Sequence, residues 1–300
     1  MKNSFVFLFI DGIGLGPKNQ YNPFYANTMS FLENLIQGKT VEGHFFSNKK
    51  TLFRGIDAKL DTQGLPQSAT GQTALFTGVN APKLIGYHYP AFPNPPLRSI
   101  LEQENIFKKV LELGGTATFA NAYGSQYFKM VEEGKRHHSA TTWSVLYSGL
   151  PFRGVKELKQ GRAVYWDFTN ENFINSRDEG IDIISAKEAG IRLSRISSEY
   201  NFLLFESFLT DMIGHKQDHQ GAERFCRLFD DFLNALISGL SDNQTLIVSS
   251  DHGNFEDLSV PSHTYNDAWL LVHGPQAPAF ETVDTIINVT DRIIECLRKS

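Results

Sequence analysis

Two short segments in the last third of the chain carry residue types that bind metal ions. Residues 210–215 read Thr-Asp-Met-Ile-Gly-His, and residues 249–254 read Ser-Ser-Asp-His-Gly-Asn. Each follows a run of β-prone residues, so its Asp and His fall where a strand gives way to a loop. Residues 262–264 add another histidine. Carboxylate and imidazole together suit borderline divalent ions such as zinc and manganese. The pattern therefore predicts a metal site formed by Asp211, His215, Asp251, His252 and His263.

Asp11 follows a continuous apolar run at residues 5–10 and opens the sequence Asp-Gly-Ile-Gly-Leu-Gly. A dinucleotide-binding glycine loop is the rival interpretation, because a strand precedes the glycines. The spacing argues against it, since Gly12, Gly14 and Gly16 alternate, whereas that fingerprint needs Gly-x-Gly-x-x-Gly at the start of a helix. Asp11 is better explained as a metal ligand with permissive backbone behind it.

Ser68 opens a segment, residues 68–78, that is predicted to form a short helix. One interpretation is a helix N-cap, because serine is favoured at that position. The other is a nucleophile, because a hydroxyl at a helix N-terminus faces free N–H groups and the positive end of the dipole. That surrounding favours an alkoxide or a bound phosphoryl group. The segment alone favours the cap.

Strands and helices that alternate along the chain must position these side chains. This alternation predicts an α/β fold, a three-layer α/β/α sandwich around a largely parallel sheet. Sites in such folds gather at the carboxyl ends of the strands, where Asp11, Asp211 and Asp251 fall. The expected strands are residues 5–10, 116–120, 202–205 and 245–248. The expected helices are residues 23–37, 68–78, 106–113, 185–200, 222–240 and 290–299, with Thr290 as a cap, and residues 90–96 are expected to be a loop.

The sequence pattern changes between residues 121 and 184, where the apolar residues show little helical or strand periodicity. We interpret this segment as a small inserted cap over a core formed by residues 1–120 and 185–300. A basic cluster in it contains Arg136, His137 and His138. Contact with a substrate phosphate or carboxylate and a solvated loop are equally open for this cluster. His219, four residues after His215, is interpreted as a surface residue or an outer neighbour of the site.

The composition of the 300-residue chain is that of an ordinary globular protein, with 41% hydrophobic and 20% charged residues. The net charge of −5 provides no basic field for nucleic acid or an anionic membrane. Cys226 and Cys296 are too few for a disulfide framework and are expected in the core. The first apolar run is too short for a signal peptide, and no stretch reaches transmembrane length. These features predict a cytoplasmic protein and leave its oligomeric state open.

Taken together, these residues make the chain resemble the alkaline phosphatase superfamily. Within it, the chain is similar to the metalloenzyme branch that contains cofactor-independent phosphoglycerate mutase and phosphopentomutase. The resemblance covers the chain up to about residue 80 and from about residue 200 onward. The motifs stand in the family's order: Asp11-Gly12, Ser68-x-x-Gly71, Asp211-Met-Ile-Gly-His215, Asp251-His252-Gly253-Asn254 and His263-Thr264.

The resemblance implies a site with two divalent metal ions, which are zinc, manganese or magnesium in the family. One ion would be bound by Asp211, His215 and His263, and the other by Asp11, Asp251, His252 and the Ser68 oxygen. Imidazole and carboxylate ligands favour zinc or manganese over magnesium. The resemblance also implies that Ser68 attacks the phosphorus of a small phosphorylated substrate and forms a phosphoserine.

Two departures from the mutase pattern favour hydrolysis of that phosphoserine by water. Mutases of this branch instead return the phosphoryl group to a different hydroxyl of a retained substrate, beneath a substantial cap. Here the insert is far shorter than the phosphoglycerate mutase cap, and Gln72 follows Gly71 where these mutases typically have histidine. We therefore expect a phosphatase or phosphoesterase, with a phosphomutase as the alternative. A metal-stabilised binding protein without activity is a further alternative, disfavoured because all seven positions are filled.

Overall fold

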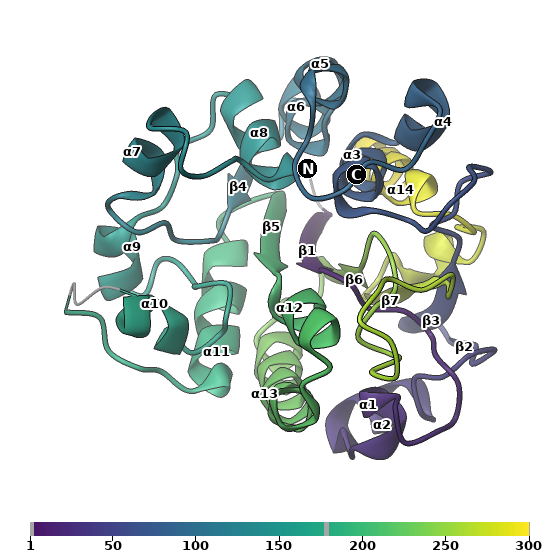
Figure 1. The fold of residues 1–300 in the computed structure, drawn as a ribbon. Helices are drawn as coiled ribbons and strands as arrows, with labels where there is room; N and C mark the ends of the chain where they lie inside the picture. The colour runs from purple at the N-terminus through teal and green to yellow at the C-terminus, as the bar shows by residue number, and fades with distance from the viewer. Residues whose placement is uncertain (1–2, 177–179, 300) are drawn as a thin grey trace.

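A seven-stranded sheet forms the centre of the protein, between two layers of helices (Figure 1). The computed structural model describes residues 3–176 and 180–299. Within them the strand order is β2-β3-β7-β6-β1-β5-β4. Strands β6, β1, β5 and β4 are parallel, whereas β7 is antiparallel to β6 and β3, and β2 is antiparallel to β3. The strands are β1 (Ser4–Ile10), β2 (Phe46–Ser47), β3 (Thr51–Ile56), β4 (Ala117–Phe119), β5 (Phe202–Ser207), β6 (Gln244–Ser249) and β7 (Ala268–His273).

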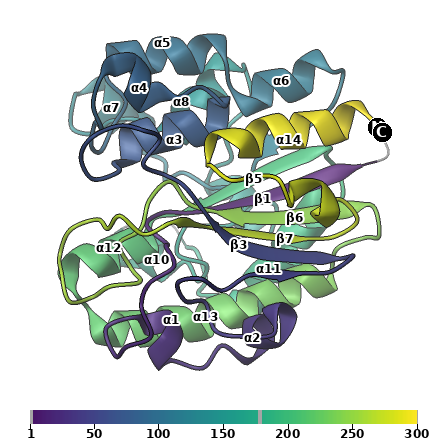
Figure 2. The same ribbon diagram turned by 90° about the vertical axis from the view of Figure 1, so that its right-hand side faces the viewer.

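The predicted α/β sandwich is confirmed by the helices on the two faces of this sheet (Figure 2). One face is covered by α3 (Ser68–Thr77), α4 (Ala81–Ile85), α5 (Pro95–Gln103), α6 (Ile106–Glu112), α8 (Ala140–Tyr147) and α14 (Ile287–Arg298). The other is covered by α1 (Pro23–Ala26), α2 (Ser30–Ile36), α11 (Ala186–Ser197) and α13 (His219–Ser238). The remaining helices are α7 (Tyr127–Glu132), α9 (Val155–Lys159), α10 (Glu171–Ser176), α12 (Leu209–Lys216) and a 3-10 turn, Ala277–Phe280.

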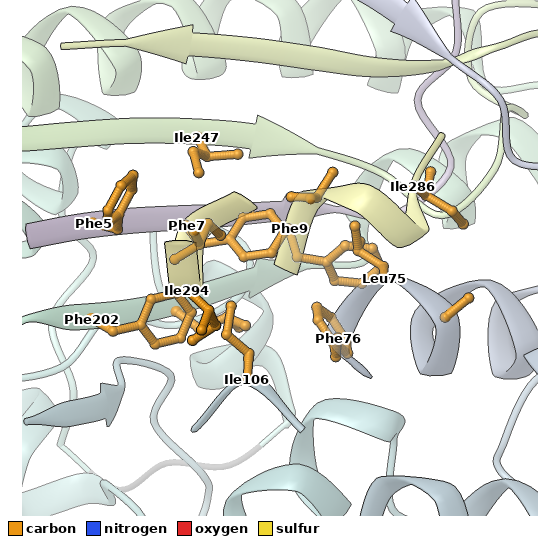
Figure 3. Close-up of a cluster of buried hydrophobic side chains, with 14 of the residues drawn as sticks. Phe5, Phe7, Phe9, Leu75, Phe76, Ile106, Phe202, Ile247, Ile286 and Ile294 are labelled. Atoms are coloured by element: carbon orange, nitrogen blue, oxygen red, sulfur yellow. The ribbon is translucent and has the colours of Figure 1, made fainter. Parts of the chain in front are cut away.

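Strand β1 is buried along its whole length because its side chains alternate between two cores. Phe5, Phe7 and Phe9 pack against residues of α3 and α14 on one face (Figure 3). Val6, Leu8 and Ile10 pack on the other face, with residues of α11 and α13. A strand covered on both faces needs apolar residues at every position, which explains its continuous apolar run.

Two predicted boundaries are wrong for reasons of local hydrogen bonding. The helix expected over residues 23–37 is two helices, α1 and α2, because the Asn27 side chain donates to the Pro23 carbonyl and the Asn27 backbone is extended. The loop expected over residues 90–96 ends early, since Pro95 and Pro96 begin α5. The first turn of a helix needs no proline N–H, and the Asn94 side chain caps it by accepting from the Leu97 N–H.

Thr290 does not cap the last helix as predicted. It lies buried inside α14, and its hydroxyl donates to the Leu75 carbonyl at 2.6 Å. Cys226 and Cys296 are buried free thiols, as expected. In the described part of the chain, no helix combines the length and the apolarity needed to cross a membrane.

The segment expected to form a cap, residues 121–184, contributes α7, α8, α9 and α10. Helix α8 packs against α3, α5 and α6 in the helical layer on one face of the sheet. Helices α7, α9 and α10 lie beyond the β4 edge (Figure 1), where Leu158 and Phe173 belong to a small separate cluster. Residues 177–179 of the expected insert lie outside the described residues. The division into core and cap stays a prediction.

Gly190 allows α11 to lie directly against α13 on the second face of the sheet. A Cβ atom at this position would come within 2.5 Å of the Phe232 carbonyl oxygen and 2.9 Å of the Leu236 nitrogen. Both atoms belong to the backbone of α13, so a larger residue must push the two helices apart.

We predict that Gly190→Ala lowers the free energy of unfolding by about 1–3 kcal/mol, because the clash with α13 outweighs the better helix propensity of alanine. Urea unfolding measures the change. Lys187→Ala, at an exposed position of α11, is the control and should change stability by less than about 0.5 kcal/mol. A Gly190→Ala protein as stable as the wild type would show that the helices separate at no appreciable cost.

Candidate metal centre

Three neighbouring strands end at one edge of the sheet and bring most of the predicted ligands together. Asp11 directly follows β1, and Asp251 and His252 follow β6. Asp211 lies in the first turn of α12, just after β5. Strands β6, β1 and β5 are adjacent and parallel, so their carboxyl ends meet. This arrangement is the one that α/β sheets use for their sites.

Helix α3 and the loop before β7 contribute the other candidates. Ser68 is the first residue of α3, whose N-cap is Gln67 without a side-chain capping bond. The prediction that Ser68 is the N-cap is therefore wrong. Its hydroxyl instead lies 3.1 Å from His252 Nε2. His263 reaches the same region from the loop between β6 and β7, and His215 lies one turn after Asp211 on α12.

Asp11, Asp251 and His252 form a first buried group, in which one ligand atom of each lies within 4.8 Å of the others. His252 Nε2 is 3.4 Å from Asp11 Oδ1 and 3.6 Å from Asp251 Oδ2. The same nitrogen faces the Ser68 hydroxyl. The serine and both carboxylates therefore converge on one imidazole nitrogen.

Asp211, His215 and His263 form a second group beside the first. Asp211 Oδ2 is 3.4 Å from His215 Nε2, and Asp211 Oδ1 is 3.5 Å from His263 Nε2. The His263 ring stacks on the His252 ring, with centroids 3.7 Å apart. Asp211, His252 and His263 also have ligand atoms within 4.8 Å of one another. The structure thus brings all seven predicted side chains together, and the two groups meet at this histidine stack.

The histidines of the second group are oriented as metal ligands are. His215 Nδ1 is 2.8 Å from the Pro261 carbonyl, and His263 Nδ1 is 2.8 Å from the Pro66 carbonyl. Each carbonyl requires an N–H on Nδ1, so in the neutral ring the Nε2 lone pair points into the group. The two Nε2 atoms are only 3.3 Å apart. A proton or a metal ion removes the repulsion between lone pairs at that distance, and the hydrogen bond with Asp211 raises the pKa of His215 to about 9. Carbonyl contacts of this kind commonly orient metal-binding imidazoles.

The carboxylates of the first group lack the hydrogen-bond donors that buried anions need. Asp11 Oδ1 and Asp251 Oδ2 are buried and accept no hydrogen bond. Burial and the neighbouring carboxylate Asp251 raise the pKa of Asp11 well above its usual value. Burial and the charge of Asp211 raise the pKa of Asp251 to about 7. Burial lowers the pKa of His252 to about 3, so this ring stays neutral and cannot balance the charge. Divalent cations supply what is missing, so the residues fit a metal centre.

Asn254 and Gln72 hold ligand carboxylates in place, a role that sequence reasoning missed. Asn254 Nδ2 donates to Asp211 Oδ1 at 2.7 Å. Gln72 Nε2 donates to Asp11 Oδ2 at 3.4 Å. The available signal was their position, since each follows closely after a predicted site residue.

Glu206 is a further buried carboxyl near the centre that the sequence did not single out. It lies in β5 and accepts a hydrogen bond from the Thr141 hydroxyl of α8. Burial raises the pKa of Glu206 to about 8. Its charge also helps to raise the pKa of Asp11. A glutamate inside an otherwise apolar strand is the signal that could have revealed it.

The basic cluster in the expected cap is divided between the surface and the interior. Arg136 and His137 are exposed. His138 is buried, with Nδ1 3.1 Å from the Tyr127 hydroxyl and its ring against Trp143. Substrate contact by these three residues stays a prediction. His219 is exposed at the start of α13.

A comparison with known families places this geometry in context. The family model of the metalloenzyme superfamily matches residues 3–298. The chain belongs to this superfamily. Membership agrees with the resemblance seen in the motifs and with the fold, and supports a centre that binds divalent metal ions.

Three similar proteins share 25% of their residues or fewer with this chain. Phosphopentomutase from Sodalis glossinidius (strain morsitans) is 25% identical over 228 residues, which are 72% of this chain and 54% of that protein. The chain thus spans about half the length of this relative. A cold-active alkaline phosphatase from Shewanella sp. superposes with a TM-score of 0.57 at 12% identity, covering 98% of this chain and 99% of that one. The PH0037 protein from Pyrococcus horikoshii gives 0.56 at 11% identity, covering 91% and 86%. These structures share the fold.

We predict opposite effects of Asp251→Asn with and without metal. In a chelator at pH 8, the variant should be more stable than the wild type by about 1–3 kcal/mol, because it removes a buried charge without a partner. With manganese or zinc it should gain less stability than the wild type, which gains about 4 kcal/mol at a thousandfold excess over the dissociation constant.

Urea unfolding with and without metal measures both effects. Asp242→Asn, at an exposed position, makes the same change of charge and should match the wild type in both conditions. Equal metal-dependent stabilisation of the wild type and Asp251→Asn would contradict a role of Asp251 in metal binding.

Proposed function

We propose that this metalloenzyme is a two-metal phosphoryl-transfer enzyme, most simply a phosphatase or phosphoesterase that hydrolyses a small phosphate ester through Ser68. The observation that carries the proposal is the position of Ser68 Oγ. It lies 3.1 Å from His252 Nε2, on the group that also contains Asp11 and Asp251. The Ser68 hydroxyl caps no helix, so its position suits a nucleophile better than a structural role.

The N-terminus of α3 is suited to bind an anionic phosphoryl group next to Ser68. Unpaired N–H groups and the helix dipole make the start of a helix attractive to anions. In α3 the N–H of Thr70 donates to the Tyr89 carbonyl, which fixes the segment that follows α4 beside this end of the helix. Ser68 is the first residue of the helix, two residues before Thr70, and its hydroxyl faces the metal-ligand candidate His252.

The proposed ligand sets are those expected from the sequence. Asp11, Asp251, His252 and the Ser68 oxygen would hold one divalent ion, and Asp211, His215 and His263 the other. Three imidazoles among the donors favour zinc or manganese, with magnesium less suited. When bound, the ions supply Lewis-acid chemistry that stabilises negative charge on a transferring phosphoryl group.

The reaction of the chain's own residues is an in-line displacement at phosphorus. The Ser68 hydroxyl loses its proton to solvent and its oxygen forms a bond to phosphorus, while the ester oxygen leaves with the electrons of the bond that breaks and takes up a proton from solvent. The product is a phosphoserine at position 68. Attack by water on this phosphoserine releases inorganic phosphate and restores the serine.

A phosphomutase is the second candidate, and the phosphopentomutase relative supports it. In that case the phosphoserine passes its phosphoryl group to another hydroxyl of the same substrate. Hydrolysis is favoured by the packing of helix α8, which belongs to the segment between β4 and β5 but lies in the helical layer of the core. The remainder of that segment leaves little chain to enclose an intermediate. Gln72 points at Asp11 where mutases of the branch typically have histidine.

A cytoplasmic location stays a prediction.

We predict that zinc- or manganese-loaded protein releases phosphate from at least one ester in a panel of phosphate mono- and diesters. Ser68→Ala should reduce this release by about 10³-fold or more, because the nucleophile is lost. Its metal content should remain near that of the wild type, since the carboxylate and imidazole ligands are intact. Ser99→Ala, at an exposed position of α5, is the matched control and should retain full activity.

Two other results would redirect the proposal. If no ester is hydrolysed although metal is bound, transfer between hydroxyls of phosphorylated sugars and acids becomes the test, and a product with the phosphate moved would establish the mutase. If Ser68→Ala leaves every activity unchanged, Ser68 is not the nucleophile, and a binding protein without turnover becomes the better interpretation.

A further inference from the structure

Glu256 is a fully buried carboxylate that accepts four hydrogen bonds beside the metal centre. Its Oε2 accepts from the backbone N–H of Gly14 at 2.9 Å and of Asn254 at 2.8 Å. Its Oε1 accepts from the Thr264 hydroxyl and from Asn266 Nδ2, the latter at 3.0 Å. All four donors are neutral, and no lysine or arginine of the described residues forms an ion pair with Glu256. Each carboxylate oxygen therefore accepts two hydrogen bonds from residues in loops.

The four donors lie on the two loops that carry the buried ligand candidates. Gly14 is three residues after Asp11, in the loop after β1. Asn254, Thr264 and Asn266 lie in the loop between β6 and β7, where Asn254 is two residues after His252 and Thr264 is next to His263. The Asn254 side chain also donates to Asp211. One carboxylate thus joins the backbone near Asp11 to the two stretches of the second loop that carry His252 and His263.

The glycines near the site make room for this side chain. A Cβ on Gly14 would come within 2.7 Å of Glu256 Oε1, and a Cβ on Gly253 within 2.3 Å of the same atom. A Cβ on Gly16 would come within 2.5 Å of the Glu256 carbonyl oxygen. The close approach explains why glycines alternate behind Asp11 without forming a nucleotide loop. They allow the loop after β1 and the loop between β6 and β7 to close around one carboxylate.

We propose that Glu256 is a positioning residue for the metal centre, which sets the affinity for both ions by fixing the ligand-bearing loop after β1 against the two stretches of the β6–β7 loop that carry His252 and His263. The inference rests on the two-metal centre proposed above. Residues that orient metal ligands typically change metal affinity by about 10–100-fold when they are altered. Glu256 differs from an ordinary outer contact because its bonds reach both ligand groups, through His263 and Asn254 on one side and Asp11 and His252 on the other.

The test is a measurement of both zinc dissociation constants by competition with a chromophoric chelator, for the wild type, Glu256→Gln and Asp167→Asn. Glutamine keeps the size of the side chain but exchanges one accepting oxygen for an NH₂ group. Asp167, in the loop between α9 and α10, is the matched control because it is also buried. It accepts hydrogen bonds from the backbone N–H groups of Thr169, Asn170 and Asn172. Thermal unfolding of the metal-free proteins separates positioning from general loss of stability.

We expect Glu256→Gln to weaken both ions by about 10–100-fold. Asp167→Asn should bind both ions within about twofold of the wild type, even where its metal-free form unfolds at a lower temperature. Wild-type affinity for both ions in Glu256→Gln would overturn the inference alone. Weakening of only one ion would overturn the claim that Glu256 serves both groups. A wild-type protein that binds no zinc would refute the proposed centre, and the inference with it.

Asn266→Ala provides a second variant that does not remove the carboxylate. It deletes one donor to Glu256 and leaves Thr264 and both backbone N–H groups in place. If Glu256→Gln does not fold, this variant decides: weaker binding of both ions than in the wild type supports the positioning role, and wild-type binding overturns it.

Discussion

The burial of negative charge at the ends of three strands is the constraint on which the rest of the site depends. Asp11 and Asp251 are withdrawn from water, and each has a carboxylate oxygen without a donor. Anions in such surroundings are unfavourable unless a cation or several donors face them. Within the described residues the basic group in ion-pair distance of both is the ring of His252, which burial keeps neutral by lowering its pKa to about 3. The buried negative charge is therefore unbalanced within the fold, and divalent metal ions would balance it.

The same strands that form the core also position this charge. Strand β1 is anchored on both faces by apolar side chains, so Asp11 can move little relative to the sheet. Its parallel neighbours deliver Asp211 and Asp251 to the same edge. The loops are more adaptable than the strands, and Glu256 joins the loop after β1 to two stretches of the loop between β6 and β7. Rigid strands place the carboxylates, and hydrogen bonds between loops adjust the imidazoles.

The parts of this arrangement that the sequence predicts are those encoded in consecutive residues. The apolar run of β1 shows that it is covered on both faces, and an Asp and a His after such runs mark the carboxyl edge. Strands β3 and β7 were not predicted. Arg54 and Gly55 interrupt the apolar pattern of β3, and both strands depend on antiparallel pairing between distant segments. The role of Glu256 likewise arises from donors on two loops that are distant in the sequence, which no local pattern reveals. The boundary between the ligand groups is also non-local, since His252 contacts members of both.

The position of β1 in the sheet has a consequence for how the protein is made. This strand is made before the other strands of its sheet, yet its two neighbours are β5 and β6, which begin at Phe202 and Gln244. At about 5–20 residues per second, the ribosome needs on the order of ten seconds or more before both partners have been made. Throughout that time an apolar strand lacks its native neighbours, and such segments readily bind other chains. The central part of the sheet can therefore form only after the residues of β6 have been made.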